Sequence, residues 1–311
     1  MSLSVNDNPI VGPEAYTDEW FEARRSSIGA SEAAAICGMS RWQQPLDVYK
    51  TKQGASDTRG SDEMHRGKLL EPAVLDWYQS KVGGYLFSPP LLIHPVHDFM
   101  CATPDALWTT QDIGNLPWSY SLDYIPIEAK TSGVKGEWGE EGTDDIPQEY
   151  VMQTQHQMAV TGAERCDVPV LGHNLNFKLY VVKRNQELID SIVEASREMM
   201  ERVANNDPPE PNWTHPKTYE LIRQVYGVSE GAVQLTEDAS ELWAEAERLV
   251  KESNRLKRGA ELNKAKVLHE MGENGIGHLV DGRHLIRKVI KREARQMKAS
   301  EYVTLRCKKS L

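Results

Sequence analysis

Long apolar runs, clustered cysteines and a basic leader segment are all missing from this sequence. No stretch approaches the roughly 20 consecutive apolar residues that span a bilayer, and the N-terminus has no secretory signal pattern. The cysteines are far apart and lack the Cys-x-x-Cys spacing of zinc sites and redox pairs. We therefore expect a soluble protein in a reducing, cytoplasmic setting. The four cysteines are Cys37, Cys101, Cys166 and Cys307.

An excess of positive charge is also missing, although a nucleic-acid-binding protein would be expected to have one. The formal net charge is −10. Its distribution is uneven, because residues from 283 onward carry +8 and residues 1–282 carry −18. An acidic body with a basic end fits a metal-carboxylate site plus a phosphate-binding element, and a solvated charge run is the alternative. The basic residues of this end are Arg283, Arg287, Lys288, Lys291, Arg292, Arg295, Lys298, Arg306, Lys308 and Lys309.

The proline-rich segment Asn206–Asn212 cannot continue a helix and indicates a linker. It separates a predicted domain at 14–205 from an extension at 217–311, with 206–216 as the linker. The domain's pattern is helices, several short strands, a helix, two strands and a closing helix. This order predicts an α/β or α+β fold rather than an all-helical one. The 40% hydrophobic content suffices for one sizeable core and a smaller second unit.

The extension contains a leucine at every seventh position, with small residues four positions after each leucine. This spacing predicts a long helix with one narrow apolar seam. The seam is suited to self-association as a coiled coil or to docking within the chain, and the sequence alone leads us to favour docking. Further on, Asp281-Gly282 between two alternating runs predicts a β-hairpin at 278–286. The seam leucines are Leu235, Leu242, Leu249 and Leu256.

The segment Tyr124–Thr131 alternates apolar and other residues, as a strand does. This alternation places Glu128 and Lys130 on one face, since side chains in a strand repeat every two residues. About twenty residues earlier, Pro104-Asp105 ends a short apolar run and leaves an accessible carboxylate. Each half alone has a mundane explanation, a surface ion pair or a turn acid. Together they offer two carboxylates for Mg²⁺ and an ammonium that orients or deprotonates water.

Further candidates flank this pair of motifs. Glu71 lies beside a helical apolar stripe, next to Pro72, which we expect to start or kink that helix. A helix predicted from Pro147 to Gly162 carries Gln153 and Gln157 one turn apart on a common face, where an amide can hydrogen-bond a nucleophilic water. The ordinary interpretations are a surface acid and solvated glutamines.

A short helix is predicted at 31–37, with Ser31 as its N-cap and Gly38 just past its end. Free backbone amides at a helix start favour phosphate, and Arg24 precedes this segment closely. A plain capped helix is the alternative.

With these pieces in order, residues 20–205 resemble the lambda-type, or YqaJ-like, recombination exonucleases of viruses, within the PD-(D/E)xK nucleases. The motifs that carry the resemblance are Trp20-x-x-x-Arg24, Ile28-Gly29-Ala30-Ser31-Glu32, Arg66–Glu71, Thr103-Pro104-Asp105, Glu128-Ala129-Lys130 and Tyr150–Gln155.

The resemblance implies a role for each matching residue. Asp105 and Glu128 bind metal with the carbonyl of Ala129, and Glu71 assists a second metal. Lys130 positions or activates the attacking water, which Gln153 contacts. The 5′-phosphate of DNA is held by Arg24, Ser31 and Thr103. A further basic residue of the family has no exact counterpart, because Gly136 stands there with Lys135 beside it.

The resemblance also implies an α/β nuclease core with a small mixed central sheet flanked by helices, in a protein that works in the cytoplasm of a bacterial host cell. It implies Mg²⁺ as cofactor, with Mn²⁺ able to substitute, and 5′→3′ degradation of linear double-stranded DNA. It further implies a ring-shaped trimer that works with a single-strand annealing protein. Relatives with an iron–sulfur cluster use three closely spaced late cysteines, so we expect no cluster here. Two alternatives remain: an endonuclease or structure-specific nuclease of the same superfamily, and a non-catalytic DNA-binding or assembly protein.

Overall fold

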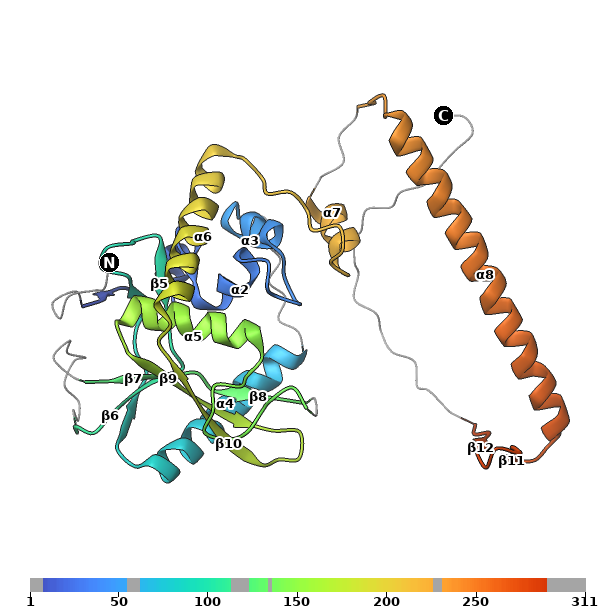
Figure 1. Cartoon of the computed structure of the whole chain (residues 1–311), viewed down its shortest axis with the longest axis horizontal. Helices are drawn as coiled ribbons and strands as arrows, with labels where there is room; N and C mark the ends of the chain where they lie inside the picture. The colour runs from blue at the N-terminus through green and yellow to red at the C-terminus, as the bar shows by residue number, and fades with distance from the viewer. Residues whose placement is uncertain (1–7, 55–61, 113–122, 134–135, 226–230, 290–311) are drawn as a thin grey trace. The chain divides into compact units, whose positions relative to one another are not determined.

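The computed structural model describes residues 8–54, 62–112, 123–133, 136–225 and 231–289 (Figure 1). The chain divides into two compact units, residues 1–225 and residues 226–311. Within the described ranges, no helix combines the length and apolar character needed to cross a bilayer.

The first unit begins with short helices that lead into two sheets. Helix α1 starts after Thr17, whose hydroxyl accepts a hydrogen bond from the Trp20 amide at 3.2 Å. The acids of its first turn and the arginines of its last turn suit the helix dipole. The helical elements between residues 18 and 82 are α1 (Asp18–Arg25), the 3₁₀ turn η1 (Ala30–Glu32), α2 (Ala33–Ile36), α3 (Pro45–Lys52) and α4 (Asp62–Val82).

The smaller sheet has the strand order β1-β4-β5-β2. In it β2 runs parallel to β5, and the other neighbours are antiparallel. Strand β5 ends shortly before Asp105, so this sheet delivers one of the predicted metal ligands. The strands are β1 (Ile10–Val11), β2 (Ile28–Gly29), β4 (Leu92–Ile93) and β5 (Met100–Ala102).

The larger sheet has the order β10-β9-β7-β6-β3, with β8 beside β9. It is mixed, since β7 and β8 run parallel to β9 and the other pairs are antiparallel. Glu128 and Ala129 form the short break between β7 and β8. The strands are β3 (Tyr85–Phe87), β6 (Ala106–Thr109), β7 (Ile125–Ile127), β8 (Lys130–Thr131), β9 (Arg165–Leu171) and β10 (Phe177–Lys183).

Helices cover both faces of the larger sheet, as alternation along β9 shows. Val168 and Val170 pack into the main core with Met152 and Met158 of α5 (Gln148–Thr161). Asp167, immediately before Val168, points to the opposite face, where it accepts a hydrogen bond at 2.7 Å from Tyr78 of α4. Helix α6 (Gln186–Asn205) packs beside α5. The predicted α/β core, a mixed sheet between helices, is confirmed.

Helix α5 confirms the sequence prediction at both ends. Pro147 immediately precedes its first residue, and Gly162 after its last residue has φ +73°. A left-handed conformation at that position costs glycine little, since it has no Cβ.

The proline-rich segment and the helix after it lie within the first compact unit. The Gln44 side chain accepts a hydrogen bond at 2.8 Å from the Asn212 amide and donates one at 3.1 Å to Thr218. Leu221 of α7 (Thr218–Val225) is buried in a cluster with Leu46. These contacts move the division of the chain from the predicted 206–216 to a point after residue 225.

The described residues of the second unit, 231–289, contain one long helix and a hairpin. Helix α8 (Glu237–Met271) begins after Thr236, whose hydroxyl accepts a hydrogen bond from the Ala239 amide. Strands β11 (Ile276–His278) and β12 (His284–Ile286) pair antiparallel around a turn in which Gly282 has φ +85°. Both the long helix and the hairpin confirm the sequence prediction. Most of the basic end, from residue 290, lies outside the described residues.

Candidate active site

Glu128 is the hub of a buried polar cluster between β7 and α5. Its side chain is nearly buried, with 3% of its surface exposed. One carboxylate oxygen accepts hydrogen bonds from the Lys130 ammonium and, at 2.6 Å, from the Gln153 amide. The other oxygen accepts from the Gln157 amide of the same helix. Sequence alternation predicted the first partner, and the one-turn spacing of the glutamines explains how both reach one carboxylate.

Asp105 enters the cluster from the loop between β5 and β6. Its amide donates to the Ile127 carbonyl at 3.1 Å, and its carboxylate accepts from the Ala129 amide at 2.8 Å. These bonds fasten the Pro104-Asp105 turn to the break that holds Glu128. Burial, then the nearby charge of Glu128, raises the pKa of Asp105 well above its ordinary value. The two predicted carboxylates are therefore close enough to repel each other.

Lys130 supplies the positive charge of the cluster. Burial disfavours its ammonium, but Glu128 and Asp105 outweigh that effect, so the pKa of Lys130 is raised above its ordinary value. The ammonium also lies 4.9 Å from the ring centre of Tyr150 on α5. A lysine held in this way stays protonated at neutral pH and acts by charge and position.

Glu71 approaches the cluster from α4. Burial and then Glu128 raise the pKa of its carboxyl, and Lys130 opposes the shift. Its neighbour Pro72 lies inside α4, ten residues after the helix begins, so the helix does not start there. The sequence predicted that Pro72 starts or kinks this helix. The observed helix continues through Pro72, and Glu71 lies near enough to Glu128 for the two carboxylates to interact.

The donor set suits a hard divalent cation. Among the described residues, no three His, Cys, Asp or Glu side chains are grouped to hold a metal ion by themselves. Asp105 and Glu128 nevertheless offer carboxylate oxygens, and the Ala129 carbonyl is adjacent in the chain. Burial is the main cause of the raised pKa of Asp105 and the charge of Glu128 adds to it, and a bound cation would favour the ionised form of both carboxylates.

The residues predicted to hold phosphate form a second group, which we call the phosphate pocket: Arg24, Ser31, Thr103 and the ring of Trp20. The Arg24 guanidinium donates to the Ser31 hydroxyl at 3.2 Å and lies 4.8 Å from the Trp20 ring centre. The Trp20 indole donates to the Thr103 hydroxyl at 3.1 Å. Both contacts of the guanidinium are neutral groups, so its charge is available to an anion.

Ser31 is not the N-cap of a regular helix, which corrects the prediction. The turn η1 begins after Gly29, whose amide donates to the Glu32 carboxylate at 2.8 Å, and α2 follows only at Ala33. Ser31 is thereby turned toward Arg24. The predicted end is confirmed, since Gly38 follows the helix with φ +69°.

A buried ion pair contacts the backbone of the phosphate pocket at Arg24. The Lys52 ammonium at the end of α3 lies 2.7 Å from the Glu32 carboxylate and donates to the Arg24 carbonyl at 2.7 Å. A Cβ added at Gly29 would come within 2.8 Å of the Arg24 guanidinium. The pocket therefore depends on a bare backbone at Gly29 and on Lys52, which the sequence analysis did not identify.

Tyr16 links the two groups. Its ring contacts Trp20 at 5.2 Å between centres, and the Lys68 ammonium lies 3.8 Å from its ring centre. Burial is the main cause that raises the pKa of Tyr16. The charges of Glu71 and Asp105 raise it further, and the charge of Arg24 lowers it, so Tyr16 interacts electrostatically with both groups. Its φ of +67° is unusual for a residue with a side chain and marks a strained position next to the site.

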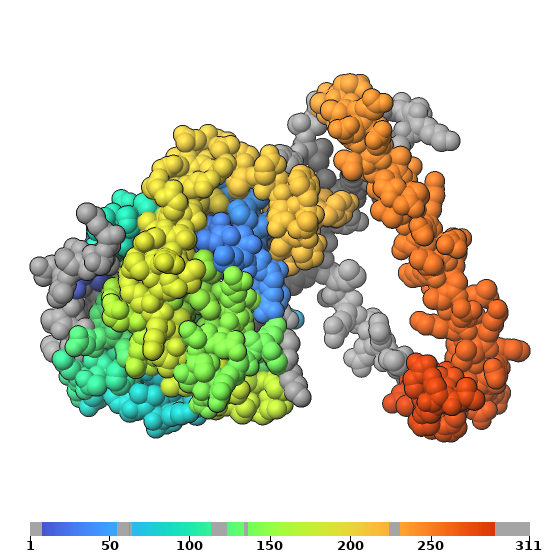
Figure 2. Space-filling model, in the orientation of Figure 1, coloured from blue at the N-terminus to red at the C-terminus, as the bar shows by residue number. Residues whose placement is uncertain are grey.

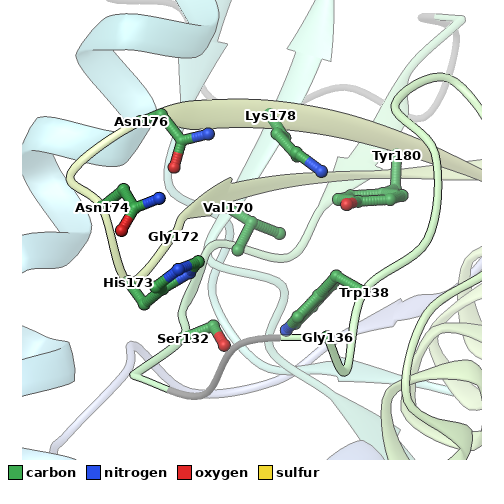
Figure 3. Close-up of a pocket in the computed structure, with 10 residues that line it drawn as sticks. All are labelled: Ser132, Gly136, Trp138, Val170, Gly172, His173, Asn174, Asn176, Lys178 and Tyr180. Carbon is green, nitrogen blue, oxygen red and sulfur yellow. The ribbon is translucent and has the colours of Figure 1, made fainter.

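A separate cavity of about 240 Å³ lies beside the cluster, under the β9–β10 turn (Figure 3). Ser132, just after β8, and Gly136 line it on one side, and Asn174 and Asn176 face them from the turn. Trp138 stacks at 5.5 Å on Tyr150, the same ring that contacts Lys130. Lys135, the remaining predicted phosphate contact, lies outside the described residues.

The region that contains the carboxylate cluster and the phosphate pocket is similar to known proteins. Residues 19–164 match the family model described as the YqaJ-like viral recombinase domain. The uncharacterised protein YqaJ of Bacillus subtilis (strain 168) is 29% identical over 192 residues, which cover 60% of this chain and 56% of that protein. The chain thus spans little more than half the length of this relative.

Solved structures with a related arrangement include two exonucleases. An alkaline exonuclease, LHK-Exo, from Laribacter hongkongensis is 21% identical, with 61% of this chain and 94% of that chain covered and a TM-score of 0.46. A phage-related exonuclease from Haemophilus somnus 129PT is 15% identical, with coverages of 58% and 96% and a TM-score of 0.42.

Proposed function

We propose that this chain, whose residues 19–164 match the YqaJ-like viral recombinase domain, is a Mg²⁺-dependent exonuclease of that family that degrades linear double-stranded DNA in the 5′→3′ direction. Its setting would be phage or prophage recombination in the bacterial cytoplasm. The observation that carries the proposal is the meeting of Asp105, Glu128 and Lys130 in one cluster, built from two sheets and closed by two glutamines of α5.

In this proposal Asp105, Glu128 and the Ala129 carbonyl hold Mg²⁺, and Glu71 assists a second ion. The bound metal supplies a Lewis acid and a nucleophilic water at neutral pH. Lys130, with its raised pKa, orients that water and stabilises negative charge in the transition state.

Gln153 fixes the carboxylate and contacts the water. Its amide nitrogen already donates to Glu128, which leaves the amide oxygen to accept a hydrogen bond from a nucleophile. Because glutamine is neutral, it orients water without adding to the repulsion between Asp105 and Glu128.

The phosphate pocket gives the proposal its direction. Arg24 and Ser31 would hold a terminal 5′-phosphate, with Thr103 as a further contact, and this anchoring would place the first internucleotide phosphate at the carboxylates. Tyr16 supports a short distance between the two groups, because charged residues of both act on the pKa of its hydroxyl. We further propose that Lys135 adds a phosphate contact, that Mn²⁺ substitutes for Mg²⁺, and that the enzyme works as a trimer with a single-strand annealing protein.

The decisive experiment compares an end-labelled linear duplex with closed circular DNA of the same sequence, each with Mg²⁺ or EDTA. Wild-type protein is expected to release nucleotides from the linear duplex only, and only with Mg²⁺. Glu128→Ala should be inactive on both. Label at the 5′ end should be released before label at the 3′ end.

Each other outcome would replace the proposal with a specific alternative. Cleavage of the circle would identify an endonuclease. Binding of both substrates by wild-type protein without any hydrolysis would identify a DNA-binding or assembly protein.

A further inference from the structure

Helix α8 exposes an apolar seam between Leu242 and Ala260, whereas Leu235, the first leucine of the predicted seam, lies before the helix begins. None of its 35 residues is buried. Leu242, Leu249 and Leu256, spaced by seven, have 72%, 52% and 60% of their surface exposed. Figure 2 shows α8 as a single rod of side chains. Helices in proteins draw most of their stability from packing an apolar face, so a helix of this length with an exposed leucine seam is suited to a partner.

The residues beside the seam limit what that partner can be. Small side chains repeat every seven residues four positions after each leucine: Ala246, Ser253 and Ala260. Leucine at one core position and a small residue at the other form a narrow seam. Such a seam lets a second helix approach closely, because the distance between helix axes depends on the side chains in contact.

The charges of α8 determine the direction of the partner. Residues 237–253 carry six acids and two bases, a net −4, whereas residues 254–271 carry five bases and two acids, a net +3. Two copies lying parallel would set like charges side by side. Two copies lying antiparallel would set the acidic half of each against the basic half of the other.

We propose that α8 is a self-association surface, on which the α8 helix of a second copy of this chain packs antiparallel. With Leu249 opposite Ser253 of the second copy, Leu242 lies opposite Ala260 and Leu256 lies opposite Ala246, so each leucine faces a small residue. Such a pair has twofold symmetry, so one surface contacts the same surface of its copy and the contact closes after two chains. The proposal is independent of catalysis and of any oligomer that the first unit forms.

The experiment measures the mass of the full-length chain in solution by sedimentation equilibrium. Leu249→Glu places a charge in the centre of the seam and is expected to halve the mass, whatever oligomer the first unit forms. Leu262→Glu is the matched control, because Leu262 has a similar exposure of 58% on the same helix but lies off the seam. It is expected to leave the mass unchanged.

A second measurement uses only wild-type protein, so it does not depend on how a variant folds. Salt screens exposed charges, so 1 M salt should weaken an antiparallel pair and strengthen a parallel one. Weaker association at high salt supports the proposal, and stronger association overturns the antiparallel arrangement. Equal masses for wild type and Leu249→Glu overturn self-association, and a lowered melting temperature in that variant would then indicate docking within the chain.

Discussion

The carboxylate cluster and the phosphate pocket solve opposite electrostatic problems. Glu128 in the cluster has 3% of its surface exposed and receives three hydrogen bonds, one of them from a lysine. Arg24 in the pocket is half-buried and contacts a hydroxyl and a ring. The cluster pairs part of its negative charge with Lys130, whereas the guanidinium of Arg24 contacts neutral groups. Under the proposed function, the cluster performs the chemistry and the pocket binds the phosphate. Changes in the cluster should therefore affect rate, and changes in the pocket should affect the choice of DNA end.

The largest effect is expected from Lys130→Met. The variant removes the positive charge that faces Glu128 and Asp105, and nucleotide release from linear duplex should slow by on the order of 10³-fold. The measurement is the single-turnover rate at saturating Mg²⁺. Lys130→Arg keeps the charge and should retain more activity than the methionine variant. A methionine variant as fast as wild type would remove Lys130 from the mechanism.

A smaller loss is expected from Gln157→Leu. Gln157 donates to the Glu128 oxygen that Lys130 and Gln153 do not reach, so its loss leaves a buried carboxylate oxygen without that donor. Loss of such a supporting partner typically lowers activity about 10-fold to 100-fold. The rate should be compared with that of Gln148→Leu, an exposed glutamine of the same helix. Equal rates for the two variants would show that Gln157 does not support the site.

His156 contacts the strand that leads to residues of both regions. Its ring contacts the Cys101 carbonyl at 3.1 Å on β5, the strand that leads to Thr103 and Asp105. Burial lowers its pKa from 6.5 to about 3. Below pH 6.5 His156 therefore binds a proton in the unfolded chain but stays neutral in the folded protein. The free energy of unfolding should fall by about 1.4 kcal/mol for each pH unit until the folded pKa is reached.

The check is urea unfolding at pH 7, 6 and 5. His156→Gln should flatten the acid slope, whereas His173→Gln, an exposed histidine at the β9–β10 turn, should keep it. Identical slopes for wild type and His156→Gln would contradict the prediction.

The smallest effect is expected from Arg24→Ala, and it is selective. Preference for 5′-phosphorylated over 5′-hydroxyl ends should fall about tenfold, the value of one charge-assisted hydrogen bond of about 1.4 kcal/mol. Rates on 5′-hydroxyl ends should hardly change. The neighbouring Arg25, exposed and paired with Glu22, provides the control variant Arg25→Ala. An equal loss on both ends would assign Arg24 a general role in DNA binding.

The sequence predicted the parts of the site that depend on local spacing. Two-residue alternation brought Glu128 and Lys130 together, and the four-residue spacing of Gln153 and Gln157 placed both amides on one helix face. The ends of α5 followed from a proline and a glycine. These features depend on backbone periodicity, which is visible in a single segment.

The parts that the sequence did not predict depend on contacts between distant segments. Lys52 pairs with Glu32 across 20 residues, and Trp20 bonds Thr103 across 83. Ser31 was assigned as a cap because its residue type favours that role, but the Glu32 carboxylate satisfies the preceding amide of Gly29 instead. The division of the chain shifted for the same reason, since Gln44 binds the segment after the prolines.

Gly29 shows how a missing side chain can control the position of a charge. A methyl group there would come within 2.8 Å of the Arg24 guanidinium, and the three nearest atoms to it all belong to Arg24. The guanidinium would therefore have to move. Under the proposed function, a single methyl group at this position would weaken the choice of DNA end and leave the rate of hydrolysis unchanged.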